Sequence, residues 1–505
     1  MPEPRTNDAV EPTPETPAAG APGPAGGHAR GGRGVVLPLA VVGALAALAV
    51  VAATGLVTGP PGSRERGSAP PGPSAGASGL PGASPAASDA PSTAPPSAAR
   101  DGLIAVVDAN GTLTTMDERG GSVVSYAVSG VSFGSPTWSP DGSRIAAIGS
   151  TASDTSIYVF TVRRAASSGA VGPVVIYRSS NRPAFYLYWT PDSRSVSFLA
   201  TEPAELSLRI APADGSAPLD GSGPGAIIRR GAPLYFDWED ADRLLLHVGT
   251  GSSSFVGDVG LDGSPVAPAI DGRGDFRAPS ASDDGRYLAY VRSTTASSGE
   301  IVVAARDGTS QHGLPVFGPA AFGFDPAADT LASIGAATSG AATTGFPMGP
   351  LRLIDADTGD ARTLVEGSVV GFFWAPDGRT IAALRLARPG DQTAQGIPAL
   401  TAAARARPVA AATPTPGAEV RLAFIDVATG ALRSERVVQP GVGFVDQILP
   451  YFDQYALSHR VWAPDSASIV LPLVDATGRA QIVVLPADGT DSRTIAHGES
   501  AFWSP

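Results

Sequence analysis

The chain has 505 residues, enough for two or three ordinary domains, and it contains no cysteine. The lack of cysteine excludes disulfide bonds, thiolate metal sites, a cysteine nucleophile and an acylated lipoprotein cysteine. The formal net charge of -12 argues against nucleic acid as a partner, because binding to phosphate needs a basic surface.

The first hundred residues divide by composition. Residues 1–33 are rich in Pro, Gly, Ala and Glu, so we expect disorder, because too few apolar side chains offset the entropy of ordering. Residues 34–58 hold an uncharged apolar run that fits the roughly 20 residues of a membrane-spanning helix. A cleavable signal peptide is the alternative, although its apolar core would be shorter, about 7–15 residues. We therefore predict one transmembrane helix that acts as a signal anchor.

Residues 59–100 form a Pro/Ser/Ala/Gly-rich stretch, which predicts a tether. Arg30 and Arg33 precede the predicted span while Arg64 and Arg66 follow it, so the positive-inside rule does not decide its orientation. A single N-terminal anchor usually delivers a large C-terminal domain outside. The prediction is a single-pass protein of the cell membrane, with its folded domain on the extracytoplasmic side.

From residue 101 to residue 505 a short phrase recurs at intervals of about 40 to 50 residues, which is the spacing of propeller blades. A short apolar strand reaches an aromatic residue, and a turn follows, complete as Trp138-Ser139-Pro140-Asp141-Gly142. Proline pre-sets φ in this turn, aspartate bonds nearby amides, and glycine accepts a positive φ. The aligned positions are Trp138, Trp189, Trp238, Ala281, Phe324, Trp374, Trp462 and Trp503.

The repeat is split between the two ends of this domain. Trp503-Ser504-Pro505 begins the phrase, and Asp101-Gly102 leads into the apolar stretch 103–107. We therefore predict an all-β fold, a β-propeller of eight four-stranded blades, or seven if one degenerate unit is not a sheet. N-terminal strands together with the C-terminal strand would close the ring and leave no open sheet edge. A two-sheet sandwich is the alternative that the regular spacing disfavours.

The interval from Trp374 to Trp462 is about twice as long as the others. It reads as one blade with two insertions. Residues 388–418 are rich in Pro, Ala and Thr and are expected to form a disordered loop. The second insertion, 439–459, contains an aromatic cluster.

The Trp-Ser-Pro-Asp-Gly phrase, followed by Ile-Ala in the next strand, resembles the repeat of TolB-type, WD-repeat-like (WD40-like) β-propellers. The resemblance covers residues 101–505. It implies a propeller fold, in a family whose members often work as periplasmic or surface interaction modules without catalysis. Similar repeats form the gating propeller of prolyl-oligopeptidase-like enzymes, whose separate α/β-hydrolase domain has no counterpart in this sequence.

Residues that could carry chemistry are few and scattered. The predicted innermost strands place four polar residues near the central channel or its mouths: Asp237, Asp275, His459 and Glu499. A channel-centred metal-dependent hydrolase or lactonase would need at least three such ligands to converge. The stretch 355–360 resembles the start of a calcium loop but lacks the later carboxylates and the bidentate Glu, which favours a turn. We predict no metal and no cofactor.

The segment 449–460 is the best candidate for a binding site. Aromatic faces beside a few polar groups are what a recognition pocket uses. The candidate ligand-binding residues are Tyr451, Phe452 and Tyr455 as the apolar wall, with Asp453, Gln454, His459 and Arg460 as the polar contacts. The alternative is a structural plug, because aromatic clusters pack more often than they bind.

These observations predict a membrane-anchored, extracytoplasmic propeller that acts as a non-catalytic binding module in the cell envelope. Its partner would be a protein, a peptide or a cell-envelope glycan, and not nucleic acid. The rival interpretation is the metal-dependent hydrolase or lactonase centred in the channel.

Overall fold

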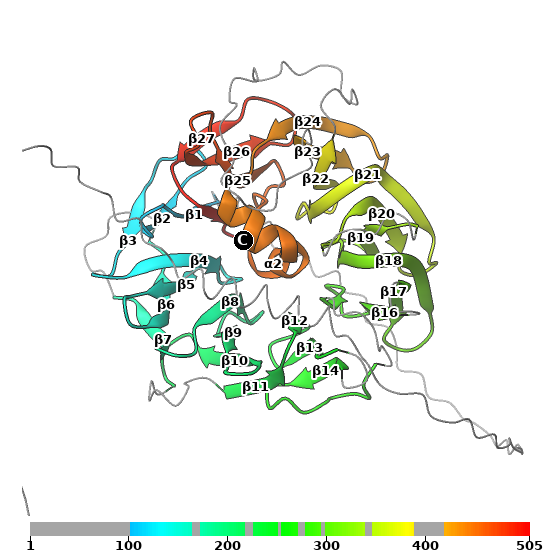
Figure 1. Ribbon diagram of the computed structural model, residues 1–505, viewed down its shortest axis with the longest axis horizontal. Coiled ribbons are helices and arrows are strands. Elements are labelled where there is room, and N and C mark those ends of the chain that lie inside the picture. Colours follow the sequence, from blue (N-terminus) through cyan, green and yellow to red (C-terminus); the bar gives the residue numbers. More distant parts are fainter. Residues whose placement is uncertain are drawn as a thin grey trace, which may run out of the picture.

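The computed structural model describes residues 102–163, 172–217, 226–250, 254–270, 278–293, 298–338, 346–387 and 419–505. These residues are mostly β-strands in antiparallel sheets, which are arranged around a common centre like the blades of a propeller (Figure 1). The predicted segments 1–33, 34–58, 59–100 and 388–418 lie outside the described residues, as does Asp275.

One sheet joins the two ends of the described chain. Its strands, in hydrogen-bonded order, are β28 (Ser500–Trp503), β1 (Ile104–Val107), β2 (Leu113–Met116) and β3 (Val124–Tyr126). Strands β28 and β1 are antiparallel, with Trp503 opposite Ile104. This is the pairing that the split repeat predicts.

The next sheets follow along the chain without crossovers. One contains β4 (Ser132–Trp138), β5 (Arg144–Ser150), β6 (Thr155–Thr161) and β7 (Val174–Ser179). The following sheet contains β8 (Ala184–Trp189), β9 (Ser195–Thr201), β10 (Leu206–Pro212) and β11 (Ala226–Gly231). A third has three strands, β12 (Leu234–Trp238), β13 (Arg243–Val248) and β14 (Phe255–Gly260).

Two long strands link three further blades into one continuous sheet. Strand β18 pairs with β17 through its first half and with β19 through its second, and β21 joins β20 to β22 in the same way. The ten strands are β15 (Ser280–Ala281), β16 (Tyr287–Ser293), β17 (Ser298–Ala305), β18 (Gln311–Phe324), β19 (Thr330–Ala336), β20 (Gly349–Asp355), β21 (Ala361–Trp374), β22 (Thr380–Ala387), β23 (Glu419–Asp426) and β24 (Leu432–Val438).

The last sheet contains β25 (Ser468–Val474), β26 (Ala480–Pro486) and β27 (Arg493–Ala496). Its innermost strand is reduced to an isolated bridge between Trp462 and Ile469. If the ten-stranded sheet is divided at its two long strands, β18 and β21, it gives three blades. Together with the five other sheets, the described residues then form eight sheet units around the ring. Each unit starts at its inner strand and ends at the rim.

Several tryptophans of the repeat connect neighbouring blades. The indole Nε1 donates to a backbone carbonyl on the inner strand of the preceding blade, from Trp138 to Phe502 at 3.0 Å and from Trp189 to Thr137 at 3.1 Å. Trp462 repeats the bond to Phe373 at 2.9 Å. An aromatic residue at this position therefore adds a directional bond to the apolar area that it buries.

The turns after these tryptophans have the predicted chemistry. Asp141 accepts hydrogen bonds from the Ser139 hydroxyl at 2.6 Å and the Ser143 amide at 2.9 Å, and Gly142 has φ of 68°. Asp355, in the suspected calcium loop, likewise accepts from the Thr358 amide at 2.8 Å. Its carboxylate closes a turn.

The predicted localisation needs correction. Across the ranges that the structure describes, no helix is both long and apolar enough to cross a membrane. Helix α2 (Phe452–Ser458) has seven residues and spans about 10 Å, against roughly 30 Å of bilayer hydrocarbon. This finding overturns the prediction of a single-pass protein of the cell membrane with an extracytoplasmic propeller.

Candidate functional site

The segment predicted to bind a ligand lies across the centre of the ring. Helix α2 follows a π-helical turn, η2 (Phe444–Ile448), and a 3-10 turn, η3 (Leu449–Tyr451). Figure 1 shows α2 over the ring centre, and it contacts β8, β12, β18 and β21. A helix of two turns thus touches strands from several blades.

Apolar side chains of the segment pack against the inner strands. Phe452 is buried, and its ring centroid lies 5.2 Å from that of Phe372 and 6.0 Å from that of Phe373, both edge to face. Tyr455 makes the same kind of contact with Tyr186, at 5.4 Å. These rings hold the helix in place and present little apolar surface to a ligand.

Gln454 provides the polar attachment of the helix. Its buried side-chain amide donates from Nε2 to the Phe236 carbonyl at 2.8 Å, and its Oε1 accepts from the Phe236 amide at 3.2 Å. Nε2 also donates to the Tyr186 hydroxyl at 2.6 Å, and that hydroxyl donates to the Gln454 carbonyl at 2.8 Å. Gln454 therefore pairs with β12 as a neighbouring strand would.

His459 ends the helix as a neutral, buried side chain. Its ring lies 5.1 Å from Tyr455 and 4.7 Å from Phe502, and its Nδ1 is 2.7 Å from the Ser458 hydroxyl. Burial lowers the pKa of His459 to about 3. The Thr137 hydroxyl donates to the Ser458 carbonyl at 2.6 Å, which ties the helix end to another blade.

The structure thus divides the seven predicted site residues. Phe452, Gln454 and His459 are buried in contacts with the ring, as a plug requires. Four others retain solvent exposure: Tyr451, Asp453 and Tyr455 are half-buried, and Arg460 is exposed. A role in binding for the segment stays a prediction.

A second polar group lies on the inner strands. The buried carboxyl of Asp237 accepts from the Tyr188 hydroxyl at 3.2 Å and from the Ala281 amide at 3.1 Å, so it joins three blades. Burial raises the pKa of Asp237 to about 7, and the charge of Asp283 adds to the shift. Burial also raises the pKa of Asp283 itself, although the nearby Arg460 opposes that shift.

Further along the ring, burial raises the pKa of Asp325 to about 6, with Asp283 and Asp377 contributing. Burial lowers the pKa of Arg460, even though this side chain is exposed to solvent. The remaining channel candidate, Glu499, is exposed. Among the described residues no three His, Asp or Glu side chains form a group that could hold a metal ion.

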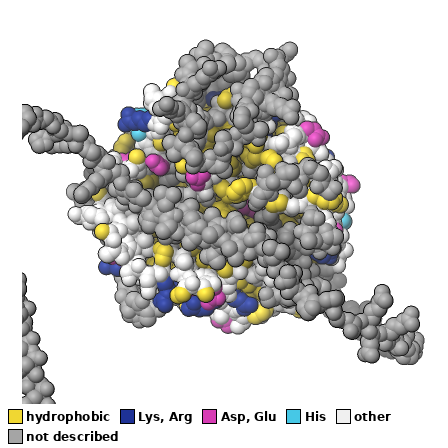
Figure 2. Space-filling view, in the orientation of Figure 1, with side chains coloured by type: hydrophobic (Ala, Val, Ile, Leu, Met, Phe, Trp, Pro, Cys, Tyr) yellow, Lys and Arg dark blue, Asp and Glu magenta, His cyan; other side chains and the backbone are white. Residues whose placement is uncertain are grey.

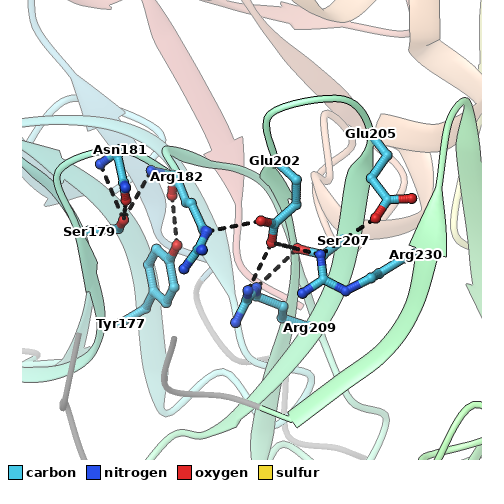
Figure 3. Close-up of polar contacts among 9 residues, drawn as sticks. All are labelled: Tyr177, Ser179, Asn181, Arg182, Glu202, Glu205, Ser207, Arg209 and Arg230. Atoms are coloured by element: carbon cyan, nitrogen blue, oxygen red, sulfur yellow. Dashed lines mark hydrogen bonds and ion pairs between the residues drawn. The ribbon is translucent and has the colours of Figure 1, made fainter. Parts of the chain in front are cut away.

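A third group surrounds Glu202, at the end of β9, and was not predicted from the sequence. Three arginines turn toward its carboxylate (Figure 3). Glu202 accepts from Arg209 Nη2 at 2.9 Å and from the Ser207 hydroxyl at 2.9 Å, and Arg182 Nε lies 2.9 Å away. The side chains of Glu202 and Arg209 are only 3% and 1% exposed.

Burial works to raise the pKa of Glu202, but the bonds from Arg209 and Ser207 outweigh it and the pKa is lowered. Arg230 Nη1 lies farther off, 3.5 Å from both Glu202 and Glu205. The one sequence signal for this group is Arg209, a charged residue inside the strand stretch Leu206-Ser207-Leu208-Arg209-Ile210.

The sequence matches no known protein family and no curated protein. Solved structures similar to the chain include TolB from Acinetobacter baumannii, with 16% identity, coverage of 71% of this chain and 81% of that one, and a TM-score of 0.33. Putative TolB from Agrobacterium tumefaciens gives 17% identity, coverage of 53% and 90%, and a TM-score of 0.30. TolB proteins are therefore among the solved structures that the chain is similar to, in line with the predicted resemblance to TolB-type propellers.

Enzymes are also among the similar structures. A prolyl endopeptidase gives 12% identity and a TM-score of 0.45, covers 74% of this chain, and is itself matched over 50% of its length. Oligogalacturonate lyase in complex with manganese gives 12% identity, coverage of 78% and 84%, and a TM-score of 0.37. Similarities of this size do not distinguish a binding protein from an enzyme.

Proposed function

We propose that this protein is a non-catalytic binding module, a rigid propeller that presents its rim and loops to a protein partner. The observation that carries the proposal is the attachment of helix α2. The side chains of Phe452, Gln454 and His459 are buried against the inner strands by aromatic contacts and hydrogen bonds. The ring centre on this side therefore serves cohesion between blades.

The hydrogen bonds of α2 explain why such a ring would be rigid. Tyr186 and Phe236 bind it to two neighbouring blades, and Thr137 binds its end to a third. Relative movement of these blades would break buried hydrogen bonds, each costing about 1–3 kcal/mol if left unmade. A partner then meets a surface of fixed shape, which lowers the entropy lost on binding.

The experiment uses the full-length chain with a photo-cross-linking amino acid at an exposed rim position, Ile227 on β11, and, as the matched control, at the buried neighbour Ile228. The proposal predicts that a partner protein is cross-linked through the rim position and not through the buried one. The purified partner should bind the chain saturably, and neither protein should be chemically altered by the other. Equal labelling from the two positions, or turnover of the captured protein, would contradict it.

A hydrolase centred on the inner strands is the second candidate. Asp237 and Asp325 have pKa values raised to about 7 and 6, and Asp283 lies near Arg460; shifted carboxyl groups of this kind gather at catalytic sites. The test measures lactone and ester hydrolysis by the wild type and by Asp283→Asn. Activity that disappears in the variant supports this candidate, whereas equal rates in both exclude Asp283 from catalysis.

A further inference from the structure

Among the residues that the structure describes, the charges around Glu202 do not balance. Three guanidinium groups, those of Arg182, Arg209 and Arg230, face the two carboxylates of Glu202 and Glu205. In a chain with a net charge of -12, this leaves a local positive charge. Figure 2 shows basic side chains along the lower rim of one face, in the region of β10, β11 and β14.

The fully buried pair needs only one arginine. Arg209 already gives Glu202 a buried, charge-assisted hydrogen bond, and Ser207 adds a second donor. Arg182 and Arg230 lie outside this pair, with side chains 31% and 43% exposed. Arg230 is the more exposed of the two and reaches Glu202 and Glu205 only at 3.5 Å, so it contributes little to stability.

Another blade shows what a purely structural cluster looks like. Glu435 is bonded by Arg385 at 2.5 Å and by Arg421 at 3.2 Å, and these two side chains are only 14% and 13% exposed. The group on β10 and β11 differs in its open side, where the ion pairs of Arg230 with described residues are both long. At 3.5 Å from both Glu202 and Glu205, its guanidinium is held loosely.

We propose that Arg182 and Arg230 form a docking site for an acidic segment of a partner protein, in which a carboxylate of the partner takes the place of Glu205. The inference rests on the proposed binding function and gives it a location and a chemistry. Glu202 shows that this set of arginines binds a carboxylate. Glu205 is an internal competitor, 39% exposed, and within the described part of the chain its ion pair is with Arg230 at 3.5 Å.

Displacement of Glu205 would let the planar guanidinium of Arg230 form two parallel N–H bonds with the incoming carboxylate. The buried Glu202–Arg209 pair stays in place and holds Arg182 through its Nε. Because the site is at the surface, salt screens the attraction between its arginines and the partner's carboxylates. The screening length is about 8 Å at physiological ionic strength, so added salt should weaken binding.

The test measures binding of a labelled hexaglutamate peptide with capped ends to the full-length chain, by fluorescence anisotropy at low salt. Arg230→Gln and Arg182→Gln should each weaken binding about five- to tenfold, as loss of a charge-assisted bond implies. Glu205→Gln should strengthen it several-fold. A hexaglutamine peptide should not bind.

Two matched controls separate the site from general charge effects. Arg433→Gln removes an equally exposed arginine from β24, and Glu118→Gln removes an exposed acid elsewhere. Both should leave the affinity unchanged. Equal effects of Arg230→Gln and Arg433→Gln, or no binding of hexaglutamate, would overturn the site.

This failure is distinguishable from failure of the proposed function. If a partner is captured through the rim and binds the Arg230→Gln variant as tightly as the wild type, the function stands and the docking site is wrong. If no partner is captured through the rim, the proposed function fails, whatever the peptide does. Circular dichroism melting of each variant checks that it is folded.

Discussion

The indole Nε1 of Trp138 donates a hydrogen bond to the carbonyl oxygen of Phe502 at 3.0 Å, across 364 residues of sequence. Phe502 lies on β28, whose other neighbour is β1. The bond therefore joins the sheet that contains both ends of the described chain to the blade that follows it. The corresponding nitrogen of Trp503 is buried and has no hydrogen-bond partner among the described residues.

This difference predicts unequal effects of the same substitution. Trp138→Phe should lower the free energy of unfolding by about 0.5–1.5 kcal/mol more than Trp503→Phe, because only Trp138 loses a buried hydrogen bond. Both variants lose similar apolar area, so the comparison isolates the hydrogen bond. Urea denaturation of the two variants measures it. Equal losses would contradict the role given to the indole nitrogen.

The plug predicts a large cost for a change at Gln454. Gln454→Leu keeps a similar volume but leaves the amide and carbonyl of Phe236 without partners, so we expect a loss of about 2–4 kcal/mol. Replacement of Ala456, an exposed residue of the same helix, by serine is the control and should change stability by less than about 0.5 kcal/mol. Similar losses in both variants would argue against the plug.

Asp237 predicts a stability that falls as pH rises. Its pKa is raised from 3.8 to about 7, so the folded state keeps a proton that the unfolded state releases between about pH 4 and pH 7. Asp237→Asn mimics the protonated acid and should remove this contribution, which is on the order of 4 kcal/mol. The variant should gain stability relative to the wild type at pH 8 and not at pH 4, as measured by urea unfolding. A constant difference would refute the assignment.

His459 predicts the opposite trend. Its pKa is lowered to about 3, so its contribution is complete above about pH 6.5 and is lost as pH falls toward 3. His459→Asn keeps a polar group near Ser458, loses packing at every pH, and should show a weaker loss of stability on acidification. In the wild type the two residues partly cancel, so the pH series must be measured on each variant. An unchanged acid limb in His459→Asn would show that another group controls it.

Much of the architecture follows from local sequence. The turn from Ser139 to Gly142 is determined by its own four residues, because the aspartate accepts local hydrogen bonds and the glycine adopts a positive φ. The structure has both features. The split phrase also led to the pairing of β1 with β28. Degenerate repeats were harder, since Trp462 keeps its aromatic while its strand is reduced to a single bridge.

The candidate sites could be predicted only in part. The segment 449–460 stood out by composition, but its residues alone did not reveal whether the aromatic rings would face solvent or the inner strands. For the group around Glu202 the sequence offers only an arginine within a strand, because Arg182, Arg209 and Arg230 come from separate strands and loops. Only the folded arrangement brings them to one carboxylate.

The sequence by itself determined the repeat, its turns and the strand that closes the ring, because these depend on backbone preferences and on apolar spacing within a few residues. The tertiary structure decided that Gln454 pairs with Phe236, that Asp237 joins three blades, and that three arginines surround Glu202. Such contacts depend on which elements meet in space, and burial there sets the protonation of Asp237 and His459.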